Sequence, residues 1–249
     1  MNQLKVLVTR PHEQSLVLAD VLIENGFCPI VAPMIKICEL NEQQQTFAAS
    51  QMADLDDVDG AIVVSRNAFR FANQIGRSHH LNFPANMRWY AVGDATAAEM
   101  IATGLQPILP GKHYDSDGLL NLGALQDVQG QTFILFAGVG GRRKIEDELR
   151  LRGASVTRIE LYRREPLSGV ACDTDKVPDV LTAMSGETVE ALAGYLVDRR
   201  NSWFSKPLFV PSARAAKIAF DMQFQKVRVT ETPSKKSLLE ALYRYAAEV

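Results

Sequence analysis

A segment that occurs twice constrains the fold of this chain more than any other feature. Residues 4–27 read LKVLVTRPHEQSLVLADVLIENGF, and residues 131–154 read QTFILFAGVGGRRKIEDELRLRGA. Each copy runs from an apolar strand through a polar or glycine turn into a helix-period segment that ends at Gly26 or Gly153. Because each copy is half of a strand–helix–strand crossover, the pattern predicts an α/β protein with two similar parallel-sheet domains, flavodoxin-like or Rossmann-like.

Further strand–helix units also occur twice, but in a different chain order. The matching pairs are 60–72 with 179–193, 89–101 with 208–220, and 114–125 with 233–242. The copies at 179–193, 208–220 and 233–242 all follow Pro166, whereas their partners precede the second copy of the opening segment. We expect residues 40–160 to form a complete domain inserted into a discontinuous domain of residues 1–36 and 167–249, with the ligand in the cleft between them. The two chain crossings, near 34–39 and 158–166, are predicted to pair as a two-stranded β-ladder.

Two segments carry more local expectations. Residues 156–164 (VTRIELYRR) read as one long strand with a charged end, and residues 119–125 read as a helix that starts at the Ser116-Asp117-Gly118 signal.

Composition and charge exclude several classes of function. A hydrophobic content of 47% and a charged content of 22% are typical of a folded soluble protein. A net charge of −2 argues against a nucleic-acid partner, and no run reaches the ~20 apolar residues of a membrane span. The first residues read as a strand rather than a signal peptide, which favours a cytoplasmic location. Cys28, Cys38 and Cys172 suggest neither a disulfide framework nor a zinc site.

Hydroxyl, arginine and glycine residues follow the carboxyl ends of the predicted strands. These ends share one edge of a parallel sheet, where α/β proteins usually bind ligands. Hydroxyls, backbone N–H groups and arginines suit carboxylates or phosphates, although each Ser, Thr or Asp could instead only cap a helix. The candidate binding residues are Thr9, Arg10, Ser65, Arg66, Asn67, Gly93, Thr96, Gly138, Gly140, Arg142, Ser185, Gly186, Ser212 and Arg214.

The turn Gly138-Val139-Gly140-Gly141 invites comparison with a dinucleotide-binding fingerprint. That fingerprint needs a third glycine where Arg143 stands, and an acid about 20 residues further on. Glu160 is near that distance, but it falls in the strand assigned to the second crossing. A turn that exposes helix N-terminal amides to an anion explains these glycines better than a nicotinamide cofactor does.

Several other polar groups allow two interpretations. The histidines show no metal-ligand spacing and read as surface residues, and the acidic run at 54–59 reads as a solvated helix end. Arg142-Arg143-Lys144 is either an exposed basic helix start or part of the site. Tyr162, which Arg163 and Arg164 follow, either packs in the hinge or reaches the cleft.

Taken in order, short motifs along the chain resemble one family. The motifs are VLVTRP, VVSRNAF, WYAVGDATAAEMIATG, DSDGLL, the glycine-arginine turn with its helix and GASV, and ELYRREP. Their order and spacing are similar to uroporphyrinogen-III synthase over essentially the whole chain. The resemblance implies two α/β domains joined by a β-ladder, and a lyase of tetrapyrrole (haem) biosynthesis that needs no cofactor or metal. Its substrate would be the linear tetrapyrrole hydroxymethylbilane, which it cyclises to uroporphyrinogen III.

The resemblance also implies roles for particular residues. Family positions that face the cleft carry over to Ser65, Thr96 and Tyr162, the last as a proposed catalytic proton donor. Two turns depart from the family pattern, because Arg214-Ala215 and Thr182-Ala183 stand where Thr-Ala and Thr-Ser are usual. Ser185, Ser212 or Arg214 would then replace the lost hydroxyl contacts. A monomer, and transient hand-over of substrate from the bilane-producing enzyme, complete this expectation.

The chemistry agrees with the motifs independently. The bilane carries eight carboxylates, so many dispersed N–H and arginine donors serve it better than one strong charge. Loss of its hydroxyl as water needs at most a weak general acid. Orientation of the terminal ring, which must attack through its substituted carbon, can supply about 7–11 kcal/mol.

Two alternatives from other classes remain at this point. The first is a non-catalytic, two-domain cytosolic binder of a small polyanion, and the second is a cofactor-dependent enzyme. Product analysis with hydroxymethylbilane separates the first from a synthase, and a thermal shift with a nicotinamide nucleotide tests the second.

Overall fold

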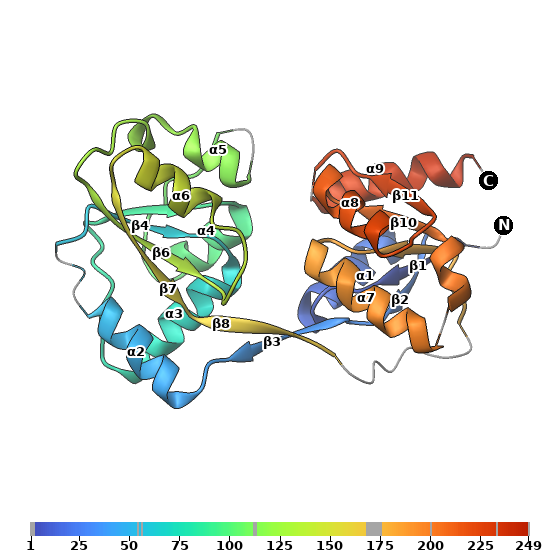
Figure 1. The fold of residues 1–249 in the computed structure, drawn as a ribbon, viewed down its shortest axis with the longest axis horizontal. Helices are drawn as coiled ribbons and strands as arrows, with labels where there is room; N and C mark the ends of the chain where they lie inside the picture. Colours follow the sequence, from blue (N-terminus) through green and yellow to red (C-terminus); the bar gives the residue numbers. More distant parts are fainter. Residues whose placement is uncertain are drawn as a thin grey trace. The chain divides into compact units, whose positions relative to one another are not determined.

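The computed structural model of the chain describes residues 3–53, 55, 57–111, 114–167, 176–199, 201–232 and 234–248. Asp54, Asp56, His113, Cys172 and Pro233, which entered the sequence arguments, lie outside the described residues. The chain forms two compact units (Figure 1). Residues 1–37 and 165–249 form the discontinuous unit, and residues 38–164 form the inserted unit.

The discontinuous unit is built on a five-stranded parallel sheet in the order β11-β10-β9-β1-β2. Its elements are β1 (Lys5–Val8), α1 (His12–Glu24), β2 (Cys28–Val31), β9 (Val180–Thr182), α7 (Gly186–Arg199), a 3₁₀ turn η2 (Asn201–Ser205), β10 (Pro207–Val210), α8 (Ala213–Asp221), β11 (Lys226–Val229) and α9 (Lys235–Ala246).

Alternating side chains of this sheet bury both of its faces. Val6 and Val8 of β1 pack with α1 and α9, whereas Leu7 between them packs with α7 and α8. The period-2 alternation of a strand sends successive side chains to opposite faces, so a fully apolar strand fits only between two helical layers. Three layers, helix–sheet–helix, therefore follow from the composition of β1 alone.

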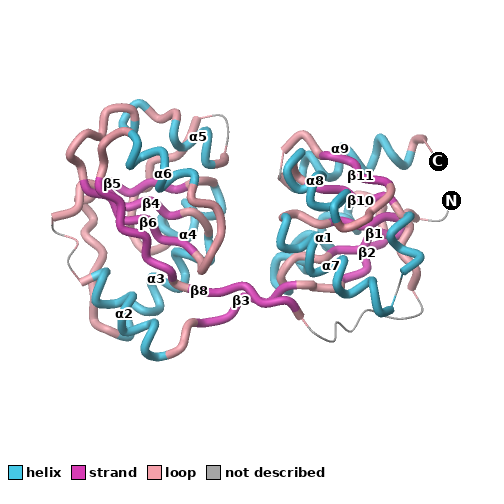
Figure 2. The backbone as a smooth tube through the Cα atoms, in the orientation of Figure 1, coloured by secondary structure: helices cyan, strands magenta, loops and turns pink. Residues whose placement is uncertain are grey.

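The inserted unit is built on a four-stranded parallel sheet in the order β5-β4-β6-β7 (Figure 2). Ile108 adds an isolated parallel bridge to Tyr90 of β5. The elements are α2 (Glu42–Met52), β4 (Gly60–Val63), α3 (Arg66–Ser78), β5 (Arg88–Ala91), α4 (Asp94–Ile101), α5 (Ser116–Leu120), η1 (Gly123–Leu125), β6 (Thr132–Ala137), α6 (Lys144–Leu151) and β7 (Ser155–Glu160).

The two sheets correspond strand by strand, as the repeated segments predict. In the order given, β10, β9, β1 and β2 match β5, β4, β6 and β7, and β11 matches the bridge at Ile108. When the strands of each unit are renumbered from 1 in chain order, the sheet of the discontinuous unit has the order 2-1-3-4-5, which is the flavodoxin order. With the bridge at Ile108 counted as its third strand, the sheet of the inserted unit has the order 3-2-1-4-5, a Rossmann order. The predicted fold class is thus confirmed. The two units have the same spatial arrangement of strands, but the first strand of each unit occupies a different position in its sheet.

Two glycines close the matching helices of the repeat. Gly26 follows α1 with φ +80°, and Gly153 follows α6 with φ +87°. Side-chain-bearing residues rarely adopt this left-handed conformation, which ends a helix and turns the chain toward the next strand.

A two-stranded antiparallel ladder of β3 (Ile35–Glu39) and β8 (Tyr162–Pro166) links the parts of the chain. The Leu167 N–H donates to the Met34 carbonyl at 2.9 Å, and Lys36 pairs with Glu165 at 3.1 Å. The pairing of the chain crossings agrees with the sequence prediction, although the second crossing starts later than residue 158.

Two local predictions were wrong. Residues 156–164 are not one strand: β7 ends at Glu160 and β8 begins at Tyr162, because residues as far as Glu160 still pair with β6. The predicted helix at 119–125 is instead the short α5 followed by η1, with Asn121 and Leu122 between them. Asp115 caps α5 by accepting from the Gly118 N–H at 2.8 Å, one residue before the predicted start signal.

Candidate active site

The carboxyl ends of β4 and β6 mark the site in the inserted unit. These neighbouring strands lead in opposite directions across the sheet, to β5 and to β7, which makes them a topological switch point where α/β sheets bind ligands. Ser65 lies just beyond β4, and Gly138 directly follows β6. Tyr162 joins them from β8, with its carbonyl accepting from the Val139 N–H at 2.7 Å.

Three side chains at this edge form a hydrogen-bonded chain, the Ser65–Tyr162–Arg164 chain. The Tyr162 hydroxyl lies 3.2 Å from the Ser65 hydroxyl, and Arg164 Nη1 donates to Tyr162 Oη at 2.9 Å. Ser65 Oγ also accepts from the Ala68 N–H at 3.1 Å, so the serine caps α3 at the same time. Capping α3 therefore does not prevent the Ser65 hydroxyl from also contacting Tyr162.

The Tyr162 ring is fixed by packing on two sides. It stacks on Phe71 with ring centroids 5.6 Å apart and planes 16° apart. Gly138 lies so close that a Cβ there would meet Tyr162 Cζ at 2.7 Å. Tyr162 is only 3% exposed, whereas Ser65 is partly exposed. The tyrosine therefore forms the base of the site, and the serine is its more accessible hydroxyl.

The glycine turn after β6 is bound internally. The Gly140 N–H donates to Glu160 Oε1 at 3.1 Å, and Arg158 donates to the carbonyls of Gly138 and Gly140. The Gly140 amide, a candidate anion donor in the sequence, already binds a carboxylate of its own chain. Glu160, at the spacing of the ribose-binding acid in dinucleotide folds, serves to hold this turn.

A buried carboxylate organises the arginines beside the turn. Glu146 is 1% exposed and pairs with Arg143 at 2.7 Å and Arg150 at 2.5 Å, with Arg158 at 3.9 Å. Burial alone would raise the pKa of Glu146, but the Arg143 hydrogen bond and the arginine charges outweigh it and hold that pKa below its ordinary value. Glu146 is therefore ionised at neutral pH.

In the discontinuous unit, the equivalent switch point lies between β1 and β9. Thr9 is fully buried there and donates to the Thr182 carbonyl at 2.5 Å, while Thr182 donates to the Leu7 carbonyl at 2.7 Å. The Thr9 hydroxyl thus cross-links two strands, and this engagement makes it unsuited to the ligand role expected of it. Ser185 is partly exposed and lies 2.8 Å from the Thr188 hydroxyl, at the start of α7.

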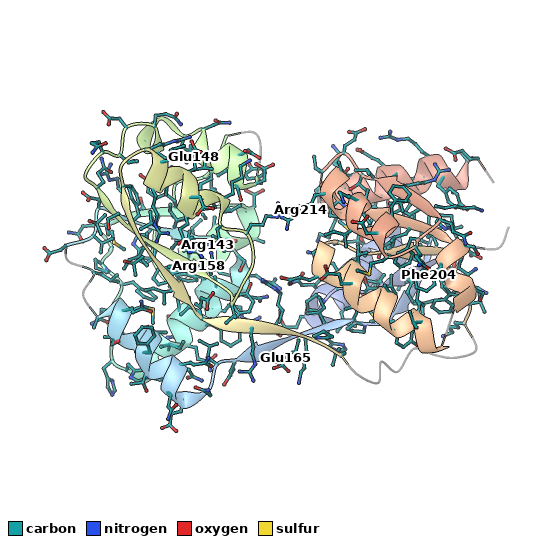
Figure 3. The ribbon with its side chains drawn as sticks, viewed as in Figure 1. Arg143, Glu148, Arg158, Glu165, Phe204 and Arg214 are labelled. Atoms are coloured by element: carbon teal, nitrogen blue, oxygen red, sulfur yellow. The ribbon has the colours of Figure 1, made fainter. Side chains whose placement is uncertain are left out.

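The remaining candidates occupy the first turns of helices. Ser212 caps α8 and accepts from the Ala215 N–H at 3.3 Å, and Arg214 extends from that helix as an exposed side chain (Figure 3). Thr96 is buried in α4, which Gly93 precedes. The other positions are Gly186 as the first residue of α7, Asn67 in α3, Arg66 near Glu99 at 4.0 Å, Arg10 bound to Gln14 at 3.1 Å, and Arg142 exposed before α6.

Comparison with known proteins decides the family. The family model described as uroporphyrinogen-III synthase HemD matches residues 17–240. The uroporphyrinogen-III synthase of Escherichia coli K12 is 29% identical over 247 residues, which cover 96% of this chain and 100% of that protein. The chain belongs to the uroporphyrinogen-III synthase family.

Other relatives agree. The Salmonella typhimurium LT2 uroporphyrinogen-III synthase is 27% identical over 248 residues, covering 96% of this chain and 100% of that protein. Crystal structures of uroporphyrinogen III synthases from Thermus thermophilus and Helicobacter pylori share the fold, with TM-scores of 0.65 and 0.64 at 18% and 13% identity. They cover 99% and 98% of this chain, and the match spans 100% of each of them.

Membership of the uroporphyrinogen-III synthase family confirms the resemblance drawn from the motifs. Sequence reasoning missed Phe71, Arg158 and Glu146 as supports of the site. Glu146 had a usable signal, because it lies three residues after Arg143 and four before Arg150 on one helix face.

Groups from other function classes are scarce in the described part of the chain. His12, His79 and His80 are exposed, and no cluster of three or more His, Cys, Asp or Glu side chains could hold a metal. No described helix is long and apolar enough to span a bilayer.

Proposed function

We propose that this chain is a lyase that cyclises hydroxymethylbilane to uroporphyrinogen III with loss of water and inversion of the terminal ring. Family membership supports the substrate, and the Ser65–Tyr162–Arg164 chain at the carboxyl edge of the inserted sheet supports the chemistry. No redox or group-transfer cofactor is required, since the product differs from the substrate by one water.

The hydrogen bonds suggest how a proton reaches the substrate. Arg164 donates to Tyr162 Oη, so we assign the Tyr162 proton to the Ser65 oxygen. Ser65 Oγ then accepts from both Tyr162 and the Ala68 N–H, which directs its own proton outward. Ser65 presents the acid, and Tyr162 replaces the proton that it gives up.

The proposed reaction balances without a further reactant. The proton joins the hydroxymethyl oxygen as its C–O bond breaks, and the adjacent pyrrole supplies the electron pair. The terminal ring attacks through its substituted carbon, and the spiro intermediate opens and recloses inverted. The proton lost when that ring regains aromaticity returns to the acid. Charge-assisted donors at the carboxyl edges, including Ser185, Ser212 and Arg214, would bind substrate carboxylates and fix the attacking ring.

We also propose that the enzyme acts as a monomer and accepts the bilane by transient hand-over from the enzyme that makes it. The edge strand β11 supports the first part, because Lys226 and Arg228 place charges on it and charged edges disfavour strand pairing between molecules. Light scattering should give the 27.5 kDa chain mass, and twice that mass would refute a monomer.

Incubation with freshly generated hydroxymethylbilane, followed by separation of the type I and type III products, tests the proposed function. We expect the type III isomer to dominate and to scale with enzyme concentration. Only type I product, at the rate of the buffer control, would show that the chain is not a synthase.

A further inference from the structure

Arg158 of β7 lies between two carboxylates and the glycine turn that follows β6. Its side chain is only 12% exposed. Its Nη2 donates to the Gly138 carbonyl at 3.0 Å and also to the Gly140 carbonyl. Its Nε lies 3.6 Å from Glu160 Oε1, and its Nη1 lies 3.9 Å from Glu146 Oε2. One guanidinium group therefore connects β7, the turn and α6.

The distances show which of these contacts fix the guanidinium group. The contacts with the two carbonyls are hydrogen bonds, whereas the contacts with the carboxylates, at 3.6 Å and 3.9 Å, are too long to be. Figure 3 shows Arg143 near Arg158, and Glu146 binds Arg143 and Arg150 through its other oxygen, Oε1. The carboxylates therefore attract the Arg158 charge, while its hydrogen bonds go to the turn.

The glycine turn, residues 138–141, depends on such contacts from outside it. Three of its four residues are glycines, and Gly140 and Gly141 have φ values of +69° and +78°. Glycine loses more conformational freedom on ordering than any other residue. Besides Arg158, Glu160 holds the turn by accepting from the Gly140 N–H at 3.1 Å. Loss of the two Arg158 hydrogen bonds should therefore loosen the turn.

The same turn contacts both Tyr162 and Arg164. The Val139 N–H donates to the Tyr162 carbonyl at 2.7 Å. A Cβ on Gly138 would meet Tyr162 Cζ at 2.7 Å, and a Cβ on Gly141 would meet Arg164 Nη2 at 3.3 Å. Because the turn packs against both partners of the hydrogen bond from Arg164 to Tyr162, a shift of the turn displaces the tyrosine hydroxyl.

We propose that Arg158 is a positioning residue for the proton transfer from Tyr162 to Ser65. Arg158 holds the turn, and the turn holds the tyrosine ring and the Arg164 guanidinium at the distances that the transfer needs. This inference rests on the proposed function, because it gives Arg158 a part in the same reaction without contact to the substrate. A misplacement of about 1 Å can lower a rate by about 10², so the effect of Arg158 should appear in kcat.

Arg158→Gln and a matched control separate positioning from stability alone. The control is Arg152→Gln. Arg152 is 19% exposed and donates to the carbonyls of Leu120 and Leu125, each at 2.8 Å. It also pairs with Glu148 at 2.9 Å within the same unit. Both variants lose two hydrogen bonds to carbonyls and a charge contact, so urea unfolding should show comparable destabilisation.

Cyclisation kinetics of these two variants give the first result. We expect kcat to fall about tenfold in Arg158→Gln, with KM changed by less than about twofold, and to stay at the wild-type value in Arg152→Gln. Equal kcat in the two variants would overturn the proposal. A raised KM with unchanged kcat in Arg158→Gln would also overturn it, because that result is typical of a substrate-binding residue.

A double-mutant cycle tests whether Arg158 acts through Tyr162. Tyr162→Phe has no proton to position, so adding Arg158→Gln to it should lower the remaining rate by less than about twofold. The same factor in both backgrounds would mean that Arg158 acts independently of the tyrosine, and the proposal would be wrong.

Arg158→Lys tests the contacts with the carbonyls against charge alone. Lysine keeps the charge, but its ammonium ends one bond short of Nη2, the atom that donates to both carbonyls. We expect kcat to fall severalfold, with a smaller loss of unfolding free energy than in Arg158→Gln. Full kcat in Arg158→Lys would show that charge suffices and would contradict the role given to the carbonyl contacts.

Amide hydrogen exchange tests the hold on the turn without the reaction. The Val139 and Gly140 N–H groups should exchange severalfold faster in Arg158→Gln and at the wild-type rate in Arg152→Gln. Unchanged exchange in Arg158→Gln would refute the proposal whatever the activity. Faster exchange in a protein whose wild type makes no type III product would instead refute the proposed function and leave the coupling of Arg158 to the turn intact.

Discussion

The Tyr162 hydroxyl lies 3.2 Å from the Ser65 hydroxyl, although 97 positions separate the two residues in the sequence. The contact joins the start of the connecting ladder to the first turn of α3. In the proposed mechanism, this contact lets Tyr162 replace the proton that Ser65 gives to the substrate.

Tyr162→Phe removes that replacement and leaves the ring in place. We expect the cyclisation rate to fall by about 10² or more, the usual contribution of a positioned acid. The share of type III product should also fall, because unassisted closure of the bilane gives type I. Isomer separation over time measures both. Tyr243→Phe is the control. Tyr243 is 48% exposed, and its hydroxyl donates to Asn25, which belongs to the discontinuous unit. A full rate and isomer ratio in Tyr162→Phe would exclude the proton role.

Gly138→Ala tests the packing of the same ring. The added Cβ would meet Tyr162 Cζ at 2.7 Å, and Phe71 on the ring limits its retreat. We expect a loss of about 1–3 kcal/mol in unfolding free energy, the usual cost of overpacking, together with reduced activity. Gly123→Ala should change neither quantity, because no atom lies within 4 Å of its added Cβ. Urea unfolding compares the two, and equal stabilities would show that the ring moves without cost.

Gly26→Ala tests the left-handed turn that ends the first repeated helix. Its added Cβ has open space, so any cost comes from φ +80° alone. We expect a destabilisation of about 1–2 kcal/mol with unchanged kcat. Gly194→Ala, inside α7 and also in open space, should instead stabilise the protein by about 0.5–1 kcal/mol. Denaturant titration measures the change in unfolding free energy for each variant. If both variants changed it in the same direction, the argument from backbone conformation would be wrong.

Glu146 makes stability depend on acid pH. Its pKa is lowered in the folded protein, so its contribution is present above the unfolded pKa of about 4.3 and is lost as pH falls through the lower folded value. Glu146→Gln should cost about 1–3 kcal/mol at pH 7 by leaving the arginines unpaired. The difference from wild type should shrink below about pH 4. Unfolding curves from pH 7 to pH 3 measure it, with Glu231→Gln as the exposed control. A difference that is constant with pH would disprove the role of ionised Glu146.

The repeated segments could predict most of the fold, because strands such as β1 and β6 are apolar on both faces and fit only a parallel sheet between helices. The break at Leu161 could not be read from residues 156–164. Charge and β-propensity continue across it, and the break depends on β6 ending at Ala137.

The candidate site was less predictable, because its contacts also depend on how the strands are placed in the folded sheet. Ser65 was named from its position at a strand end, whereas Tyr162 was named from its place in the predicted crossing strand and from the family resemblance. Their contact, however, depends on where β8 leaves the sheet. The engagement of Thr9 with Thr182, and of Gly140 with Glu160, likewise depends on strands that only the folded sheet brings together.

The order in which strands enter each sheet has a consequence for synthesis. β1 is flanked by β2 and β9, yet 148 residues lie between Val31 and Val180. At ribosomal speed the first unit waits on the order of 10–30 s for its remaining strands, during which the whole inserted unit emerges and can close its own core. The nascent β1–α1–β2 segment meanwhile has one side of β1 unpaired, and this interval is where the protein most needs protection from aggregation.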